Sequence, residues 1–142
     1  QADRAFYIGR YLDERVAREA ALKLKEISYI QTEAFAAGEL KHGTIALIEE
    51  GPPVVALVSD PATAYQTLSN LQEVKARGAR TLVITTEELS QGEDEFIIPN
   101  VPVQFAPLVL AVVGQLIAYY TTLDRGLDID KPRNLAKSVT VE

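Results

Sequence analysis

The stretch that decides the fold is residues 19–42, EAALKLKEISYIQTEAFAAGELKH. Its first half continues an apolar pattern that begins upstream, with one apolar residue every three or four positions: Leu12, Val16, Ala20, Leu24, Ile27 and Ile30. That spacing is typical of a helix buried along one side, and it predicts a helix from about Leu12 to Gln31. Residues 36–38, Ala-Ala-Gly, break this register, and residues 39–43 are expected to form a loop or a short helical turn.

Three charged residues share another side of the predicted helix. Glu19, Lys23 and Glu26 are four and three positions apart, which places them on one ridge. The ridge has two interpretations. One is a row of exposed ion pairs, which is the commoner use of such spacing. The other is a carboxylate base beside an ammonium group, the pair that proton transfer next to a carbonyl requires. Spacing alone does not decide between them.

Beyond this helix, the chain alternates strands and helices. Apolar runs predict four strands, at residues 5–9, 54–58, 81–85 and 95–98. A second helix is expected from about Ala62 to Arg77, closed by Gly78. This alternation predicts an α/β fold, a doubly wound parallel sheet flanked by helices. Ligands bind such sheets at the carboxyl ends of the strands, so we expect the charged ridge to face that crevice.

The last predicted helix runs from Val103 or Pro107 to about Leu123. It is apolar nearly all round, with Leu108, Val112 and Tyr119 on one face and Leu110, Val113 and Ile117 on another. A helix of this kind is buried on more than one side. Its expected neighbours are the sheet and a partner domain or subunit.

The composition excludes several classes of protein. A chain of 142 residues forms about one domain, and 47% hydrophobic with 24% charged residues is ordinary for a soluble fold. The net charge of −6 argues against a surface for nucleic acid or anionic membranes. No apolar run is expected to reach the length of a membrane span and no signal peptide is seen, so the cytoplasm is the expected compartment. The absence of methionine indicates a piece of a longer protein.

The motif content disfavours several kinds of site. Neither Gly-x-Gly-x-x-Gly nor Gly-Lys-Ser/Thr occurs, and one histidine without cysteine rules out the usual zinc sites. Asp128 and Asp130 resemble a cation site, but ordinary turn residues are the preferred interpretation. Taken alone, His42 is typical of a surface or structural histidine, and Lys137 of a charge on a frayed tail.

Two runs of sequence carry a resemblance to a known family. Residues 19–42 and residues 130–142, DKPRNLAKSVTVE, resemble the second sugar-isomerase (SIS) domain and the C-terminal tail of the isomerizing, glutamine-dependent glucosamine-fructose-6-phosphate aminotransferases. The runs occur in the family's order, and the resemblance covers essentially the whole chain. It implies a SIS domain at residues 1–126 and a tail at residues 127–142 that contributes to the sugar-phosphate site.

The resemblance also implies roles for individual residues. Glu26 corresponds to the carboxylate that moves a proton between C1 and C2 of the sugar, and Lys23 to the lysine that stabilises the developing enediolate. His42 corresponds to a histidine that helps to open the sugar ring and enters the site from the neighbouring subunit. Lys137 corresponds to the lysine that opens fructose 6-phosphate through a Schiff base, and Ala136 to a residue whose backbone touches the sugar.

The implied parent enzyme converts fructose 6-phosphate and glutamine into glucosamine 6-phosphate and glutamate. It is implied to be a homodimer that needs no metal or organic cofactor and binds neither nucleic acid nor membrane. Its first SIS domain, with a Ser/Thr-rich phosphate cradle, and its glutaminase domain are missing here. The fragment is therefore expected to fold and dimerise but to be inactive alone.

The sequence departs from the family's usual pattern at three positions. Tyr11 and Ala20 stand where glycine is common, and Thr44 where proline is usual; Tyr11 puts the shape of the first turn in doubt. Two rival interpretations remain open: a non-catalytic SIS module that senses sugar phosphates, and a purely structural dimerisation domain.

Overall fold

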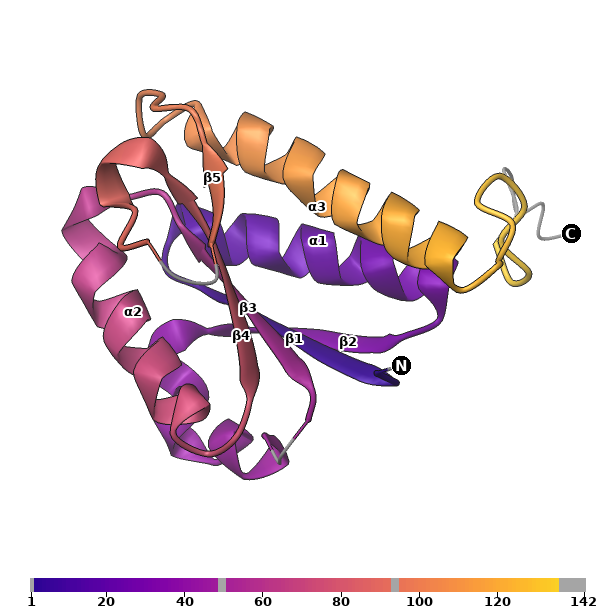
Figure 1. The fold of residues 1–142 in the computed structure, drawn as a ribbon, viewed down its shortest axis with the longest axis horizontal. Coiled ribbons are helices and arrows are strands. Elements are labelled where there is room, and N and C mark those ends of the chain that lie inside the picture. The colour runs from indigo at the N-terminus through magenta and orange to yellow at the C-terminus, as the bar shows by residue number, and fades with distance from the viewer. Residues whose placement is uncertain (1, 49–50, 93–94, 136–142) are drawn as a thin grey trace, which may run out of the picture.

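A computed structural model describes residues 2–48, 51–92 and 95–135. Five strands form one sheet in the spatial order β2-β1-β3-β4-β5, with every neighbouring pair parallel (Figure 1). The strands are β1 (Arg4–Gly9), β2 (Gln31–Ala36), β3 (Pro53–Val58), β4 (Arg80–Thr86) and β5 (Glu95–Ile98). The helices are α1 (Leu12–Ser28), α2 (Pro61–Lys75) and α3 (Ala106–Asp124), with short 3₁₀ helices η1 (Ala37–His42), η2 (Thr44–Leu47) and η3 (Glu87–Leu89). The predicted α/β fold with a doubly wound parallel sheet is confirmed.

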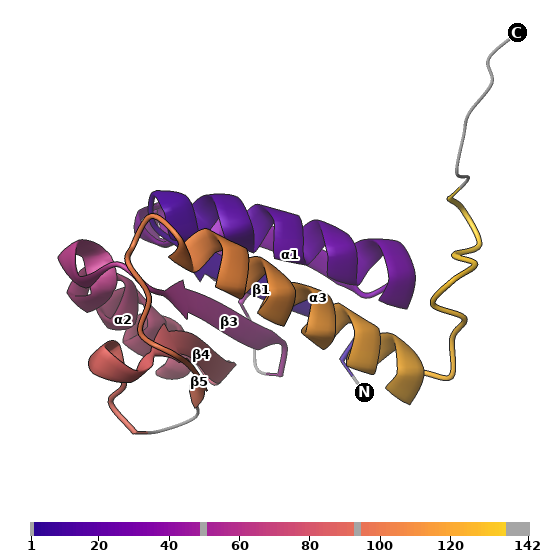
Figure 2. The same cartoon turned by 90° about the horizontal axis from the view of Figure 1, so that it is seen from above.

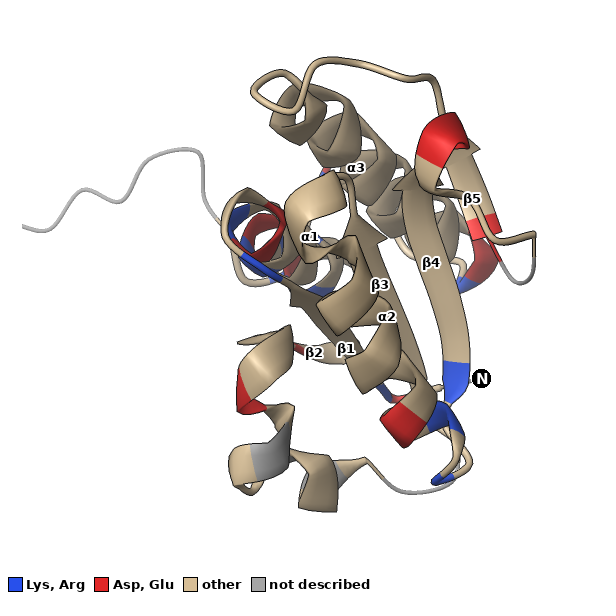
Figure 3. Cartoon of the chain, turned by 90° about the vertical axis from the view of Figure 1, so that its left-hand side faces the viewer, with Lys and Arg blue, Asp and Glu red and all other residues tan. Residues whose placement is uncertain are grey.

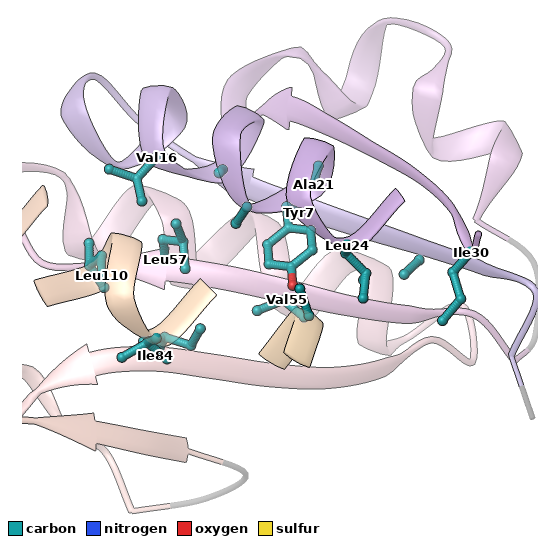
Figure 4. Packing of buried hydrophobic residues seen from close by; sticks show 14 of the residues in the cluster. Tyr7, Val16, Ala21, Leu24, Ile30, Val55, Leu57, Ile84 and Leu110 are labelled. Carbon is teal, nitrogen blue, oxygen red and sulfur yellow. The ribbon is translucent and has the colours of Figure 1, made fainter. Parts of the chain in front are cut away.

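Helices cover both faces of the sheet. α1 and α3 lie side by side on one face, and α2 and η1 pack together on the other (Figures 1 and 2). Strand β1 contributes side chains to the apolar clusters on both faces of the sheet, because alternate side chains of a strand point in opposite directions. Tyr7 belongs to the apolar cluster beneath α1 and α3 (Figure 4), whereas Phe6 and Ile8 belong to the cluster beneath α2.

Helix α1 is shorter than its apolar pattern predicts. It ends at Ser28, whose hydroxyl donates to the carbonyl oxygen of Leu24 at 2.5 Å, and Tyr29 follows in the left-handed conformation with φ 60°. The prediction that the helix continues to Gln31 is therefore wrong. Ile30 is buried in the same cluster as the helix, but from the connection that follows it. Its position coincides with the helical register by chance.

Strand β2 was not predicted by any apolar run. It lies at the edge of the sheet and pairs with β1, with Arg4 opposite Gln31 and Gly9 opposite Ala36. Gln31 and Glu33 are exposed, and only Thr32 of this strand is buried. A strand with so little buried apolar surface is defined by its pairing with β1, which the local sequence does not reveal.

Helix α3 confirms the predicted apolar helix and leaves one side uncovered. Its inner side packs against α1 so closely that a Cβ added at Gly114 would lie 2.8 Å from the Cβ of Ala20. Its outer side exposes Leu108, Val112, Leu116, Tyr119, Tyr120 and Leu123. The partner domain or subunit that the sequence predicts as a second neighbour would cover this outer side.

Length and composition alone would allow α3 to cross a membrane. It has 19 residues and a mean hydropathy of 1.6. The expectation that no apolar run reaches the length of a membrane span is therefore wrong. Core helices of soluble proteins satisfy the same criterion, and α3 packs along α1 with 33% of its apolar window buried in the described structure.

The turn between β1 and α1 is tight and strained. A Cβ at Gly9 would lie 2.7 Å from the backbone carbon of Asp13, so only glycine fits there. Tyr11 adopts φ 51° and ψ −116°, a conformation that residues with a Cβ rarely occupy. Its side chain is 76% exposed and gains little from packing. Tyr11 therefore does alter the first turn, because its backbone is held in a strained conformation.

Replacing Tyr11 by glycine is expected to raise the free energy of unfolding of this chain by about 1–2 kcal/mol. Glycine occupies this conformation without strain, and its greater freedom in the unfolded chain offsets only part of the gain. Urea unfolding measures the change. Tyr65→Ala is the control, because Tyr65 is 82% exposed on α2 and its loss should change stability by no more than about 0.5 kcal/mol. A Tyr11→Gly variant less stable than the parent would contradict the prediction.

Candidate functional site

The charged ridge of α1 forms the pairs that its spacing predicts. The Lys23 Nζ lies 3.1 Å from Glu26 Oε2 and 3.4 Å from Glu19 Oε1. The hydrogen bond to Glu26 is the largest cause of a raised pKa of the Lys23 ammonium, so this group stays charged. The Glu26 side chain is 26% exposed, against 52% for Glu19. The ridge therefore presents one ammonium between two carboxylates, and Glu26 is the more sheltered carboxylate.

Glu26 lies near the amino ends of the strands, whereas the sequence analysis expects it near their carboxyl ends. Helix α1 runs antiparallel to the strands and is about 25 Å long at 1.5 Å per residue, so its last turn returns to the amino ends of the strands. The chain enters β2 there, where the Gln31 N–H donates to the Asp3 carbonyl oxygen at 3.0 Å. The prediction that the ridge faces the crevice at the carboxyl ends is therefore wrong for Glu26. Figure 3 shows the acidic and basic residues side by side on α1.

The structure does not bring His42 and Glu26 of one chain together. His42 is the last residue of η1 and its side chain is exposed. η1 packs against α2, with Ala37 and Leu40 buried in the cluster beneath that helix. Glu26 is on α1, which covers the opposite face. The two residues therefore lie on elements that cover opposite faces of the sheet.

The C-terminal segment, in contrast, returns to the helix end that carries Glu26. The backbone N–H of Arg133 donates to the Tyr29 hydroxyl at 2.7 Å, and the Arg133 guanidinium carbon lies 4.4 Å from the centre of the Tyr29 ring. Tyr29 is only three residues beyond Glu26. Lys137 and Ala136, which the sequence analysis assigned to the site, lie outside the described residues.

The turn before this segment is organised by Asp128. Its carboxylate accepts hydrogen bonds from the backbone N–H groups of Asp130 at 2.9 Å and Lys131 at 3.2 Å. This is the use expected of an ordinary turn residue. Within residues 2–48, 51–92 and 95–135, no group of three or more His, Cys, Asp or Glu side chains could hold a metal ion.

Sequence reasoning missed Asp13, a carboxylate in the first turn of α1 that is hydrogen-bonded to the loop after β3, at the carboxyl ends of the strands. It is 2% exposed, and it accepts hydrogen bonds from the Ser59 backbone N–H at 2.9 Å and the Ser59 hydroxyl at 2.5 Å. Burial raises the pKa of Asp13, and the hydrogen bonds from Ser59 oppose that shift. Nothing in the local sequence distinguishes Asp13 from the partly exposed Glu14 beside it.

A hollow of about 660 Å³ also opens at the carboxyl end of β1. Arg10, Tyr11, Arg15 and Glu39 are among its lining residues. The Arg10 guanidinium is held by Asn70, to whose Oδ1 it donates at 2.9 Å. The hollow includes none of the residues that the sequence analysis assigned to catalysis.

Comparisons with known proteins identify the family and the fold of this chain. The sequence profile of the SIS domain family matches residues 1–125. The chain is 62% identical over 138 residues to a glutamine-fructose-6-phosphate aminotransferase [isomerizing] of Streptococcus pneumoniae R6, and 61% identical to that of Lactiplantibacillus plantarum. Each alignment covers 97% of this chain but only 23% of the relative. The chain thus spans about a quarter of the length of these curated relatives.

Two solved structures have the same fold as this chain, and the chain again covers only part of each. The C-terminal domain of glucosamine-fructose-6-phosphate aminotransferase from Francisella tularensis superposes with a TM-score of 0.86 at 36% identity, over 91% of this chain and 38% of that one. Glucosamine-6-phosphate deaminase from Thermotoga maritima superposes with a TM-score of 0.80 at 28% identity, over 99% and 41%. The resemblance seen in the sequence is confirmed.

Proposed function

Because this chain belongs to the SIS domain family, we propose that it is the second sugar-isomerase domain of an isomerizing glutamine-fructose-6-phosphate aminotransferase. The observation that carries the proposal is the return of the C-terminal segment to Tyr29, three residues beyond the sheltered carboxylate of Glu26. The whole enzyme would be a cytoplasmic homodimer that makes glucosamine 6-phosphate and glutamate from fructose 6-phosphate and glutamine. No metal or organic cofactor enters this chemistry.

Glu26 is the base of the proposed isomerisation. Ammonia attacks C2 of the open-chain sugar and displaces the Lys137 amine of the Schiff base, which leaves an imine at C2 and the free lysine. The carboxylate then removes a proton from C1 and returns it to C2. A carboxylate suits both steps because it can accept and give back the same proton. The Lys23 ammonium, 3.1 Å from Glu26, orients the carboxylate and supplies positive charge near the electron-rich intermediate.

Lys137 and Ala136 complete the proposed sugar site from the tail. Lys137 is four residues beyond Arg133, and four residues span at most about 14 Å. That length is compatible with an approach of the Lys137 amine to a sugar held at the end of α1. There the amine would attack C2 of the open ketose and release water, so that the ring stays open. The Ala136 backbone would contact the same sugar.

His42 acts in the proposed site of the neighbouring subunit. The position of His42 and Glu26 on elements that cover opposite faces of the sheet supports this assignment. Each site of the dimer would then combine Glu26 from one chain with His42 from its partner. A monomer would carry two incomplete sites.

Mixing two inactive variants of the full-length enzyme tests this arrangement. Glu26→Gln and His42→Ala are each expected to be inactive as homodimers. After subunit exchange, half of the dimers are mixed, and one of the two sites in each mixed dimer has both residues intact. The mixture should therefore recover about a quarter of wild-type activity. If both residues came from one chain, every site would carry a lesion and the mixture would stay inactive.

A further inference from the structure

We propose that the hollow of about 660 Å³ at the carboxyl end of β1 binds a phosphomonoester, whose phosphate is held by Arg10 and Arg15. Ligands of parallel α/β sheets bind at this end of the strands, and the volume is in the range of sites for small organic ligands. The hollow is distinct from the proposed sugar site, because Glu26 is in the last turn of α1, near the amino ends of the strands. The inference goes beyond the proposed function, since it uses none of the residues assigned to isomerisation.

The Arg10 guanidinium is held between two elements. Its Nη2 donates to the Oδ1 of Asn70 at 2.9 Å, and Asn70 is buried on α2. On the side of η1 it lies against Gly38, where an added Cβ would be 3.2 Å from both terminal nitrogens. A guanidinium fixed in this way loses little conformational freedom when it binds an anion, and its planar fork matches two oxygens of a phosphate.

The Arg10 side chain still lacks an acceptor and a countercharge. Its Nε–H is buried and has no hydrogen-bond partner among the described residues, and buried donors of this kind are rare. Neither Arg10 nor Arg15 forms an ion pair with a described residue. A phosphate in the hollow would supply both the acceptor and the countercharge.

The charges around the hollow favour an anion. Glu14 and Glu39 are the carboxylates among its described lining residues. Glu14 is already paired with Arg18 at 2.7 Å, so the two lining guanidinium groups outnumber the remaining carboxylate of Glu39. This surplus of positive charge attracts a phosphate dianion.

The hollow also includes the first turn of α1. Tyr11 precedes the helix, and its side chain makes no capping hydrogen bond. The backbone N–H groups at the start of a helix, together with the helix dipole, favour negative charge. The helix start therefore adds to the attraction that the two arginines exert on a phosphate.

Tyr11 accounts for the organic part of the ligand. Its side chain lines the hollow and is 76% exposed, and the neighbouring Leu12 is 47% exposed. Its backbone is strained, with φ 51°, and residues in such conformations cluster at ligand sites. Inorganic phosphate would leave this apolar wall uncovered, whereas a phosphomonoester with a ring or apolar body would cover it.

Protection of Arg15 from phenylglyoxal tests the site in the full-length protein. Phenylglyoxal modifies accessible guanidinium groups, and mass spectrometry of peptides gives the rate at each arginine. Phenyl phosphate is the probe, because it is a phosphomonoester that does not resemble a sugar, and inorganic phosphate is the comparison. Saturating phenyl phosphate should slow modification of Arg15 at least fivefold and should bind about three to ten times more tightly than inorganic phosphate. Modification of Arg77, an exposed arginine elsewhere, should not change.

Matched variants separate the contributions of the lining residues. Arg10→Gln should weaken binding of phenyl phosphate about tenfold, because a charge-assisted hydrogen bond is lost. Glu39→Gln should strengthen binding about two- to fivefold, because it removes a negative charge from the lining. Tyr11→Gly should lower the affinity for phenyl phosphate to that for inorganic phosphate. Arg77→Gln should change neither affinity.

Three results would overturn the inference. Protection of Arg15 that survives Arg10→Gln would come from binding elsewhere, such as the proposed sugar site. An Arg15 that is unreactive before any ligand is added would show that another part of the protein fills the hollow. Equal affinities for the two probes in the parent protein would indicate an anion site without recognition of an organic body.

A second variant keeps the test decisive if Arg10→Gln fails to fold. Arg15 is exposed, so Arg15→Gln should leave the fold intact. Protection of Arg10 is then the readout, and phenyl phosphate should bind about tenfold more weakly than to the parent protein. Unchanged affinity would overturn the inference. None of these outcomes bears on the experiment that mixes Glu26→Gln with His42→Ala.

Discussion

Replacing Glu26 by glutamine in the full-length enzyme is expected to lower the rate of isomerisation about a thousandfold while sugar binding stays within a few fold. A positioned general base contributes about 10²–10⁴ in rate, and an amide of the same shape cannot accept the proton. The amide oxygen can still accept a hydrogen bond from the Lys23 ammonium, now 3.1 Å from the carboxylate. The loss should therefore appear in kcat rather than KM.

Two measurements check this result. Nuclear magnetic resonance in deuterated water follows proton exchange at C1 and C2, and calorimetry follows binding of fructose 6-phosphate. Glu14→Gln is the matched control, because Glu14 is also on α1 and is also paired to a cation, Arg18, at 2.7 Å. It lies at the other end of the helix and should leave exchange unchanged. A Glu26→Gln enzyme within tenfold of wild type would favour the sensing module or the structural domain instead.

The second large effect is expected at Asp13. Replacing it by alanine should lower the free energy of unfolding of this chain by about 3–5 kcal/mol, because the Ser59 N–H and hydroxyl lose a buried charged partner at 2.9 and 2.5 Å. Asp13→Asn should cost less than about 1.5 kcal/mol, since an amide of the same shape can still pair with Ser59. Urea unfolding compares the variants. Equal losses in both would show that Asp13 acts by charge alone.

The pH dependence of stability gives an independent check on Asp13. Burial raises its pKa in the folded chain above the ordinary value, so the folded state binds its proton more readily than the unfolded state. Stability from this group is then fully present below the unfolded pKa and is lost as the pH rises through the folded pKa. The parent chain should gain stability relative to Asp13→Asn as the pH is lowered from 7 into this window. A difference that does not vary with pH would contradict a raised pKa.

The success of the sequence analysis differed between elements for physical reasons. α3 and β3 were predicted because each buries a long apolar surface that leaves a clear pattern. β2 was missed because it is an edge strand in which only Thr32 is buried. The end of α1 was misplaced because Ile30 is apolar at a helical spacing although the helix has already ended.

In the candidate site, too, one part could be predicted from the sequence and another could not. The sequence by itself determined the fold class and the Glu19–Lys23–Glu26 ridge, because helical periodicity follows from spacing along one element. Only the tertiary structure decided at which end of the strands Glu26 lies, which face of the sheet carries His42 and where Arg133 contacts Tyr29. These depend on how the strands pair and on contacts between residues far apart in the chain, which local patterns do not encode.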